Sequence, residues 1–329
     1  AMVTVRMRPQ AVRMACRATT NGRSSTRATM GPTAATKEGP VAAIPFIDTH
    51  VHFYDLQHPA LEYGWLQPGV KHHILEAIEP IHAQRYWADD WLAEHRFANL
   101  VKSIHVECAV GTPDPVEETR WLQAFADRLG HPHGIVAEVH LARPDAQAVL
   151  EEHLACANMR GVRDFGEGEY LVDPAWRRGL AHLGRHELVY CVDPRPETFA
   201  QIKDLAAAFP DTRISLDHAG FPLSREDDYL AFWRSELASL AEAPNVFVKI
   251  SALGMGDPRW TVDSMRPLVL HCIESFGVER TVFGTNWPVD RLFSSYPDVI
   301  DAYERIIAEF TPAEQTAMFS ANAERYFRI

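Results

Sequence analysis

The residues with the clearest chemical potential are the alternating polar side chains of segment 48–52, whose sequence is Asp-Thr-His-Val-His. Residues two apart in an extended strand point to the same face, so Asp48, His50 and His52 are expected to share one face. Two imidazoles at this spacing can ligate one metal ion, with a nearby carboxylate as a further ligand or as a partner of a ligand. The apolar residues 44–47 before them are typical of a buried strand, which favours a functional site over solvated histidines on an edge strand.

Glu107 is a second candidate because it interrupts the apolar run 100–108. An unpaired carboxylate is costly to bury, so Glu107 is expected to meet a metal ion, an arginine or a partner that shares its proton. A structural ion pair is the alternative interpretation, and His105 on the same face suits a site or a core role equally. We predict His50, His52 and Glu107 as metal ligands, with zinc as the expected divalent ion.

Three residues that follow later apolar runs are candidates for catalysis. His218 stands where the run 213–217 stops and a loop rich in glycine and proline begins. Asn286 ends another apolar run with an amide, which cannot accept a proton at neutral pH, and Asp290 lies four residues further on. We predict catalytic roles for His218, Asn286 and Asp290, and the general base stays open between Asp290, Glu107 and His218.

Four residues are candidates for substrate binding. Arg163 follows an apolar run and could hold a carboxylate or carbonyl group through two hydrogen bonds, or pair structurally with Asp164 or Glu167. Lys249 is either a cation of the site or a side chain that reaches toward solvent. The aromatic residues predicted to contact the substrate are Trp65 and Trp287.

The chemistry-bearing residues must be positioned by elements that alternate along the chain. Short apolar runs rich in Val, Ile, Leu and Phe predict strands buried on both faces, separated by stretches with helical spacing. The expected strands are 44–48, 100–108, 134–141, 159–164, 188–193, 213–217, 246–251 and 281–285. Eight strands that alternate with helices predict an α/β fold of the (β/α)8 TIM-barrel type, in which chemistry lies at the carboxyl ends of the strands. A doubly wound open sheet is the alternative, but it usually carries a glycine-rich turn after its first strand.

Two segments stand apart from this alternation. Residues 53–99 form a long insertion, expected to be partly helical and to wall the active site. Residues 1–40 carry seven basic residues against one acid, a net charge of +6, whereas the remainder carries 25 basic and 43 acidic residues, or −18. We expect 1–43 to be a basic, disordered N-terminal extension, with a transit peptide as the alternative, and 44–329 to be a single domain.

Composition limits the partners and the compartment. The formal net charge of −12 argues against a nucleic-acid partner, and no apolar run approaches the length of a membrane helix. Five scattered cysteines without paired spacing suggest neither a disulfide framework nor a cysteine zinc site. We therefore expect a small-molecule substrate, no nucleic-acid or membrane partner, and a cytoplasmic location, or a mitochondrial one if the extension is a transit peptide. Homo-oligomerisation stays open.

The motifs of residues 44–329 together resemble the amidohydrolase superfamily, in the branch that contains sugar lactonases and 2-pyrone-4,6-dicarboxylate lactonases. The resemblance rests on the segments 47–52, 106–107, 160–163, 217–222, 283–288 and 322–326. Each motif is short, but their order and spacing are fairly specific. The family fold is a distorted (β/α)8 barrel, as the strand count also predicts.

The resemblance implies roles for several residues. His50 and His52 match the pair that binds metal or polarises the substrate, and His218 matches the histidine of the sixth strand. Glu107 matches an acidic ligand of metal-using members, although some lactonases of the branch use no metal. Asn286 departs from the pattern, because much of the superfamily carries an aspartate there as general base.

We therefore expect a hydrolase that opens a lactone, either of a sugar acid or of a related cyclic ester, by attack of an activated water. A divalent ion would polarise the carbonyl group and activate the water. Two alternatives remain: a lactone isomerase or decarboxylase on the same barrel, since fold does not fix reaction, and a non-catalytic ligand-binding barrel, since Asn286 replaces the acid.

Overall fold

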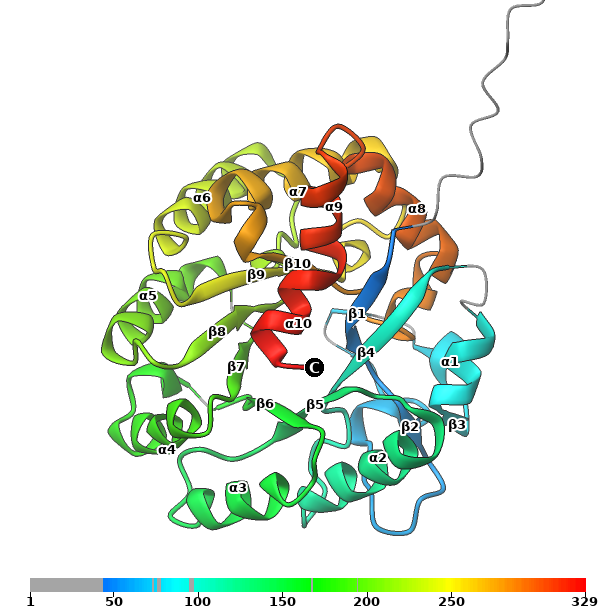
Figure 1. Ribbon diagram of the computed structural model, residues 1–329, viewed down its shortest axis with the longest axis vertical. Coiled ribbons are helices and arrows are strands. Elements are labelled where there is room, and N and C mark those ends of the chain that lie inside the picture. Colours follow the sequence, from blue (N-terminus) through cyan, green and yellow to red (C-terminus); the bar gives the residue numbers. More distant parts are fainter. Residues whose placement is uncertain (1–43, 73, 76–77, 95–97, 167, 194) are drawn as a thin grey trace, which may run out of the picture. The chain divides into compact units, whose positions relative to one another are not determined.

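The computed structural model describes residues 44–329 apart from residues 73, 76–77, 95–97, 167 and 194, so the predictions made for 1–43 lie outside the described residues. Eight parallel strands follow one another around a barrel with helices outside them, which confirms the predicted (β/α)8 fold (Figure 1). The strands are β1 (Phe46–Val51), β4 (Leu100–Val106), β5 (Gly134–Glu138), β6 (Met159–Arg163), β7 (Val189–Val192), β8 (Arg213–Leu216), β9 (Val246–Ile250) and β10 (Thr281–Phe283).

All eight predicted strands are present, and most end earlier than the apolar runs suggested. The run 281–285 ends as a strand at Phe283, and the run 213–217 ends at Leu216. Residues just beyond several strands adopt left-handed backbone conformations, with φ of 54° at His218, 56° at Ala252 and 58° at Asn286. Such conformations are strained for residues other than glycine and gather at functional sites. The chain thus leaves the sheet at His218 and Asn286, two residues that line the cavity.

The helices that follow the strands bury one apolar stripe each against the outside of the barrel. They are α2 (Val116–Leu129), α3 (Ala146–Leu154), α4 (Pro174–Arg185), α5 (Phe199–Ala208), α6 (Asp227–Leu240), α7 (Val262–Phe276) and α8 (Tyr296–Ile306). Fully buried aromatic residues such as Trp176 of α4 and Trp233 of α6 anchor these helices. Among the described residues, no helix is long and apolar enough to cross a membrane.

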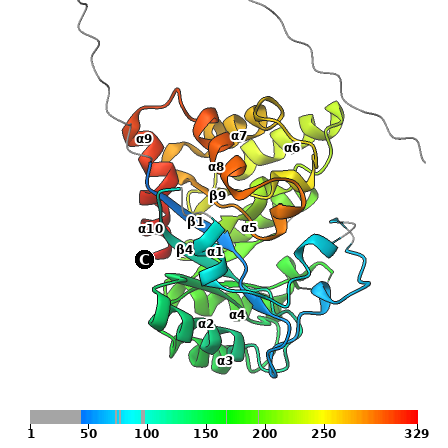
Figure 2. The same ribbon diagram turned by 90° about the vertical axis from the view of Figure 1, so that its right-hand side faces the viewer.

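The C-terminal segment closes one end of the barrel. Helices α9 (Pro312–Thr316) and α10 (Asn322–Phe327) lie across the barrel in Figure 1, and Figure 2 shows α10 at one end of it. Phe327 packs into the inner core, and Tyr326 stacks on Phe247 at 4.1 Å between ring centroids. Arg213, the first residue of β8, donates to the carbonyl oxygen of Tyr326, so α10 covers the amino ends of the strands. The carboxyl ends are therefore the end left for a site.

The predicted insertion after β1 is partly helical, as expected. It contains the two-stranded ribbon β2 (Tyr54–Asp55) and β3 (Arg85–Tyr86), two short 3-10 turns (Gly64–Leu66 and Glu79–Ile81) and α1 (Ala88–Glu94). Trp91 of α1 is fully buried and packs on Phe53, which ties the insertion to the chain just after β1.

Between β1 and β10 the barrel is closed mainly by side-chain hydrogen bonds and less by backbone hydrogen bonds between strands. The backbone contributes a single bridge between Val51 and Trp287. Thr285 donates to Asp48 through its amide at 2.9 Å and its hydroxyl at 2.6 Å, and Thr49 donates to the carbonyl oxygen of Phe283 at 2.7 Å. We call this contact of β1 with residues 283–287 the seam.

The seam predicts a stability effect of the Thr285 hydroxyl. At pH 8 Asp48, whose pKa burial raises to about 6, is ionised, and a hydrogen bond to a buried charge contributes about 1.5–3 kcal/mol. Thr285→Val should lower the free energy of unfolding by about that amount, measured by urea denaturation. The control Thr285→Ser keeps the hydroxyl and should lose much less, so equal losses in the two variants would contradict this role.

Candidate active site at the carboxyl end of the barrel

A cavity of about 500 Å³ lies where the strands end. Six of the predicted site residues line it: His52, Trp65, Glu107, Arg163, His218 and Asn286. They come from five strand ends and the insertion, so segments far apart in the sequence converge here as the barrel fold requires. The other predicted site residues, His50, Lys249, Trp287 and Asp290, lie behind this lining.

His50 and His52 form a close pair whose ring nitrogens face each other. Their Nε2 atoms are 3.2 Å apart. His52 must donate from Nδ1 to the carbonyl oxygen of Val106 at 2.8 Å, because a carbonyl only accepts, so Nε2 of the neutral ring carries a lone pair. Burial, above all, lowers the pKa values of both histidines well below their usual range and keeps the rings neutral. Two buried imidazoles in this arrangement suit a shared cation.

A buried ion pair supports His50 from below. Nδ1 of His50 faces Oδ2 of Asp217 at 3.5 Å, and Lys249 contacts Oδ1 of the same carboxylate at 2.9 Å. Ser215 also donates to Oδ1, at 2.8 Å. All three charged or ionisable side chains are fully buried. A carboxylate behind a ligating histidine favours the tautomer with the proton on the far nitrogen and leaves the near nitrogen free for a metal ion.

His218 completes a cluster of three histidines. Its ring centroid lies 4.5 Å from that of His50, which in turn lies 4.9 Å from that of His52. Nδ1 of His218 lies 2.8 Å from the hydroxyl of Ser251, and Nε2 lies 3.9 Å from Asp193. Burial, the largest cause, lowers the pKa of His218 well below its usual range, so the ring is neutral at the cavity wall.

Glu107 meets an arginine, one of the partners predicted for it. Nε of Arg163 donates to Oε1 of Glu107 in a short hydrogen bond, and Nη2 donates to the carbonyl oxygen of Glu107 at 3.2 Å. Oε2 of Glu107 is buried without a hydrogen-bond partner among the described residues. Burial raises the pKa of Glu107 to about 8, although Arg163 opposes that shift. Of the alternative partners of Arg163, Glu167 lies outside the described residues.

The metal set predicted from the sequence is only partly assembled. Among the described residues, His50 and His52 approach each other closely, whereas Glu107 does not join them in a group whose ligand atoms all lie within 4.8 Å. The role of Glu107 as a ligand therefore stays a prediction that rests on its unpaired oxygen. His50 and His52 fit a divalent ion, since each is a neutral imidazole whose Nδ1 faces an acceptor and whose Nε2 is left to bind the ion.

Asn286 and Asp290 form a pair at the end of β10. Nδ2 of Asn286 donates to Oδ1 of Asp290 at 3.0 Å. Burial raises the pKa of Asp290 to about 8, and the charge of Asp48 adds to the shift. Asp290 is therefore mostly protonated at pH 7 and unsuited to accept a proton there. Asp48, expected to share the site face of His50, lies instead in the seam, where it also accepts from Tyr296 at 3.0 Å.

Two of the residues predicted to bind substrate have partners away from the cavity. Lys249 forms the ion pair with Asp217, and its Nζ lies 5.6 Å from the ring centroid of Phe327, inside the barrel. Trp287 donates from its indole nitrogen to Glu94 of α1 in a short hydrogen bond, and its carbonyl oxygen accepts from the amide of His52 at 2.8 Å. Through these contacts both residues stabilise the structure, and their roles in substrate binding stay predictions.

Asp193 is a cavity residue that is not among the site residues predicted from the sequence. It follows β7, lines the cavity, and its Oδ1 has no hydrogen-bond partner among the described residues. Burial raises its pKa to about 7, whereas the positive charge of Arg163 lowers it. The position of Asp193 directly after an apolar strand was the signal available in the sequence, since it is the same signal that identified His218.

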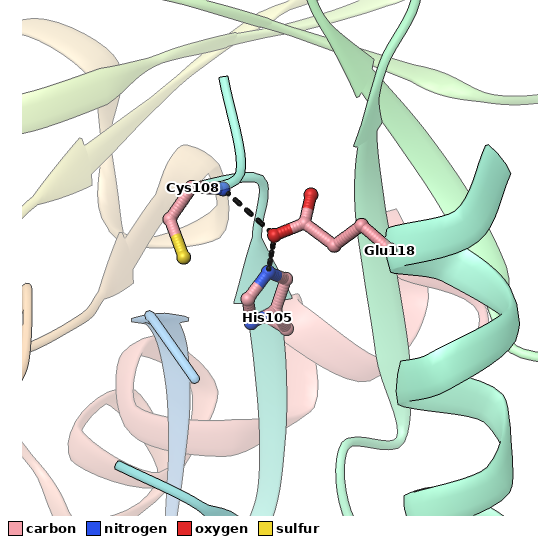
Figure 3. A group of neighbouring side chains, drawn as sticks. All are labelled: His105, Cys108 and Glu118. Carbon is pink, nitrogen blue, oxygen red and sulfur yellow. Dashed lines mark hydrogen bonds and ion pairs between the residues drawn. The ribbon is translucent and has the colours of Figure 1, made fainter. Parts of the chain in front are cut away.

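A second cluster, formed by His105, Cys108 and Glu118, has the residue types of a metal site (Figure 3). Oε1 of Glu118 accepts from the amides of Cys108 and Ala109 at 3.1 and 3.0 Å and faces Nε2 of His105 at 3.3 Å. Nδ1 of His105 accepts from the amide of Phe53 at 3.1 Å, so its proton is on Nε2 and points at Glu118.

The side chains of this second cluster have protein partners: Glu118 accepts from two backbone amides and faces His105, and Sγ of Cys108 donates to the carbonyl oxygen of Phe53 at 3.2 Å. The cluster joins the residue after His52 to the residues after Glu107 and to α2, which carries Glu118. We interpret it as a support that fixes the ends of β1 and β4 beside the cavity, since buried polar networks rigidify a structure when every member is paired.

Comparison with known proteins agrees with this geometry. A family model described as amidohydrolase matches residues 47–329. An uncharacterized protein, y4mH of Sinorhizobium fredii, is 37% identical over 298 residues, which cover 87% of this chain and 99% of the relative. An L-fucono-1,5-lactonase of Burkholderia multivorans is 27% identical over 305 residues, covering 86% of this chain and 96% of the relative.

A solved structure shares the arrangement as well. The crystal structure of an amidohydrolase from Burkholderia multivorans with bound Zn has a TM-score of 0.74 and 26% sequence identity, covering 86% of this chain and 99% of its own. The match of the family model spans nearly all of the described barrel, and the resemblance inferred from the motifs is confirmed. The chain therefore belongs to the amidohydrolase family and is a hydrolase.

Proposed function

We propose that the protein hydrolyses a lactone at the cavity above His50 and His52. The observation that carries the proposal is the pair of neutral imidazoles with Nε2 atoms 3.2 Å apart, next to a third imidazole. Two of the three rings, those of His52 and His218, line the cavity. The L-fucono-1,5-lactonase of Burkholderia multivorans, which resembles nearly the whole barrel, supports ester opening as the reaction.

His50 and His52 would hold a divalent ion, with Glu107 as the predicted carboxylate ligand, and zinc is favoured by the related structure with bound Zn. Such an ion would supply Lewis-acid polarisation of the ester carbonyl group and of water. Asp217, paired with Lys249, favours the tautomer of His50 that carries its proton on Nδ1. Nε2 is then free to bind the ion.

His218 is the general base that the geometry favours. Its ring is neutral, lines the cavity and has Asp193 at 3.9 Å from Nε2. When His218 takes a proton from the attacking water, the carboxylate of Asp193 stabilises the imidazolium and the alcohol of the opened ring can receive the proton afterwards. Asn286 lines the cavity, and the amide hydrogen that its Nδ2 does not give to Asp290 can be donated to the substrate.

The activity itself is the first prediction. Purified protein supplied with Zn²⁺ should release one acid equivalent per lactone, measured by pH-stat with background hydrolysis subtracted. His50→Ala and His218→Ala should each lower kcat/KM on the order of 100-fold or more. The control His186→Ala changes an exposed histidine at the end of α4 and should leave the rate unchanged.

Two outcomes would contradict the first prediction. Substrate consumption without acid release would indicate an isomerase instead of a hydrolase, and release of carbon dioxide would indicate a decarboxylase. Full lactonase activity in both His50→Ala and His218→Ala would remove the proposed site from the reaction.

Asp193 predicts a pH dependence. The ionised carboxylate stabilises the imidazolium, so kcat/KM should rise as the pH increases through about 7, the pKa to which burial raises Asp193. Arg163, Arg195 and Lys249 oppose that shift, and Asp217 adds to it. Asp193→Asn should lower kcat/KM about 10–100-fold and abolish this rise.

Glu138 offers a matched control for the pH profile. It is also a buried carboxylate whose pKa burial raises to about 7, but it lies outside the lining of the cavity. Glu138→Gln should keep the rise near pH 7. If the rise in kcat/KM near pH 7 disappears in Glu138→Gln and persists in Asp193→Asn, the titrating group is not Asp193.

The support of His50 predicts a change in metal affinity. Asp217→Asn should weaken Zn²⁺ binding about 10–100-fold, measured by competition with a chromogenic chelator. Asp217→Asn alone leaves Lys249 as an unpaired buried charge and should also destabilise the protein. The double variant Asp217→Asn/Lys249→Met removes that charge, so it should recover stability while its affinity stays low; wild-type affinity in the double variant would contradict the role.

A further inference from the structure

The cavity above the histidines has two chemically different parts. Its floor is polar and consists of the catalytic candidates described above. The described side chains of its outer wall are mostly apolar: Ile74, Val110, Phe165, Phe221, Met255 and Val289. Each comes from a different segment after β1, β4, β6, β8, β9 or β10, so the apolar surface surrounds the space above the floor.

This wall is poorly suited to a polyhydroxylated ring. Hydroxyl groups that leave water need hydrogen-bond partners, and each one left unpaired costs about 1–3 kcal/mol. Two wall residues besides Arg195 carry polar side-chain atoms, Trp65 and His72. The indole nitrogen of Trp65 already donates to the carbonyl oxygen of Cys108 at 2.8 Å. Nδ1 of His72 already accepts from the backbone amides of Ile74 and Leu75 at 3.2 and 3.3 Å. Hydrocarbon against the same wall would instead gain about 25 cal/mol for each Å² removed from water.

Arg195 adds a positive charge to this apolar wall. It follows β7, is exposed, and lies 5.8 Å from the ring centroid of Phe221. No carboxylate within ion-pair distance of its guanidinium is found among the described residues. Arg163 differs, because its Nε and Nη2 are engaged by Glu107. Arg195 is thus the cavity cation with its hydrogen-bond donors available, and a guanidinium binds a carboxylate through two parallel bonds.

We propose that the substrate is a lactone with a hydrocarbon body and a carboxylate, held by the apolar wall and by Arg195, and not a polyhydroxylated sugar lactone. This inference rests on the proposed lactonase function and names its substrate class. Arg195 is the residue that would select the carboxylate, and Met255 and Val110 are residues that would select the hydrocarbon.

Three lactones with the same six-membered ring test the substrate class. They are δ-nonalactone, its counterpart in which the terminal methyl group of the chain is a carboxylate, and D-glucono-δ-lactone. The expected order of kcat/KM is the carboxylated alkyl lactone, then δ-nonalactone, then the polyhydroxylated lactone, with at least tenfold between neighbours. Preference for D-glucono-δ-lactone would overturn the proposal.

Variants assign the two preferences to residues. Arg195→Gln should lower kcat/KM for the carboxylated lactone at least tenfold more than for δ-nonalactone, and an equal loss on both would overturn the role of Arg195. Met255→Gln, of similar shape but polar, should narrow the gap between δ-nonalactone and D-glucono-δ-lactone. Arg128→Gln is the matched control, since Arg128 is an exposed arginine 5.0 Å from the ring of Phe125 on α2, outside the cavity lining, and should change neither ratio.

Binding separates this proposal from the lactonase proposal. Octanoate and gluconate carry the same carboxylate on an apolar and a polyhydroxylated chain, and their affinities can be measured by calorimetry without turnover. Tighter binding of octanoate, weakened at least tenfold by Arg195→Gln, supports the apolar anion site even if no lactone is opened, and in that case only the proposed reaction fails. Tighter binding of gluconate overturns the substrate class whatever the reaction is.

Discussion

The hydrogen bonds of Asp48 with Thr285 are the contact on which the rest of the site depends, because they join the first and last strands of the barrel. The strands are parallel and ordered from β1 to β10, and this pair is bridged by the backbone at one point. The approach is so close that a Cβ atom on Gly284 would lie 2.9 Å from Cβ of His50. Closure of the barrel and placement of His50 are therefore one event: the seam that completes the sheet also fixes the first histidine.

Charge is balanced in pairs around this fixed point. Lys249 forms an ion pair with Asp217 beneath His50, and Arg163 donates a hydrogen bond to Glu107 just after β4. Burying one member of either pair without the other would cost several kcal/mol, so the two members of each pair are buried together. The histidines between these pairs remain neutral because they are buried, which is the state that metal binding and proton acceptance both require.

The sequence predicted the eight strands because strands buried on both faces leave uninterrupted apolar runs, and it predicted His50, His52, Glu107 and His218 because each interrupts or follows such a run. It could not predict which residue each of these side chains would contact. The alternation of side chains along a strand predicted that Asp48 shares a face with the histidines. Tertiary contacts with Thr285 and Tyr296 instead direct its carboxylate into the seam. Lys249 carries a charge that suits a substrate-binding residue. Only the structure shows that its Nζ lies 2.9 Å from Asp217, 32 positions earlier in the chain, and forms an ion pair with it.

Reaction and selectivity are encoded in different parts of this fold. The floor of the cavity is built from strand ends whose positions are tied to closure of the barrel, so changes there endanger folding as well as chemistry. The wall is built from side chains that loops contribute one at a time, such as Val110, Phe221 and Met255. Loops tolerate substitution far better than the strands they join. A relative that shares about a quarter of its residues can therefore share the floor and its reaction, while the substrate has to be inferred from the wall of this chain.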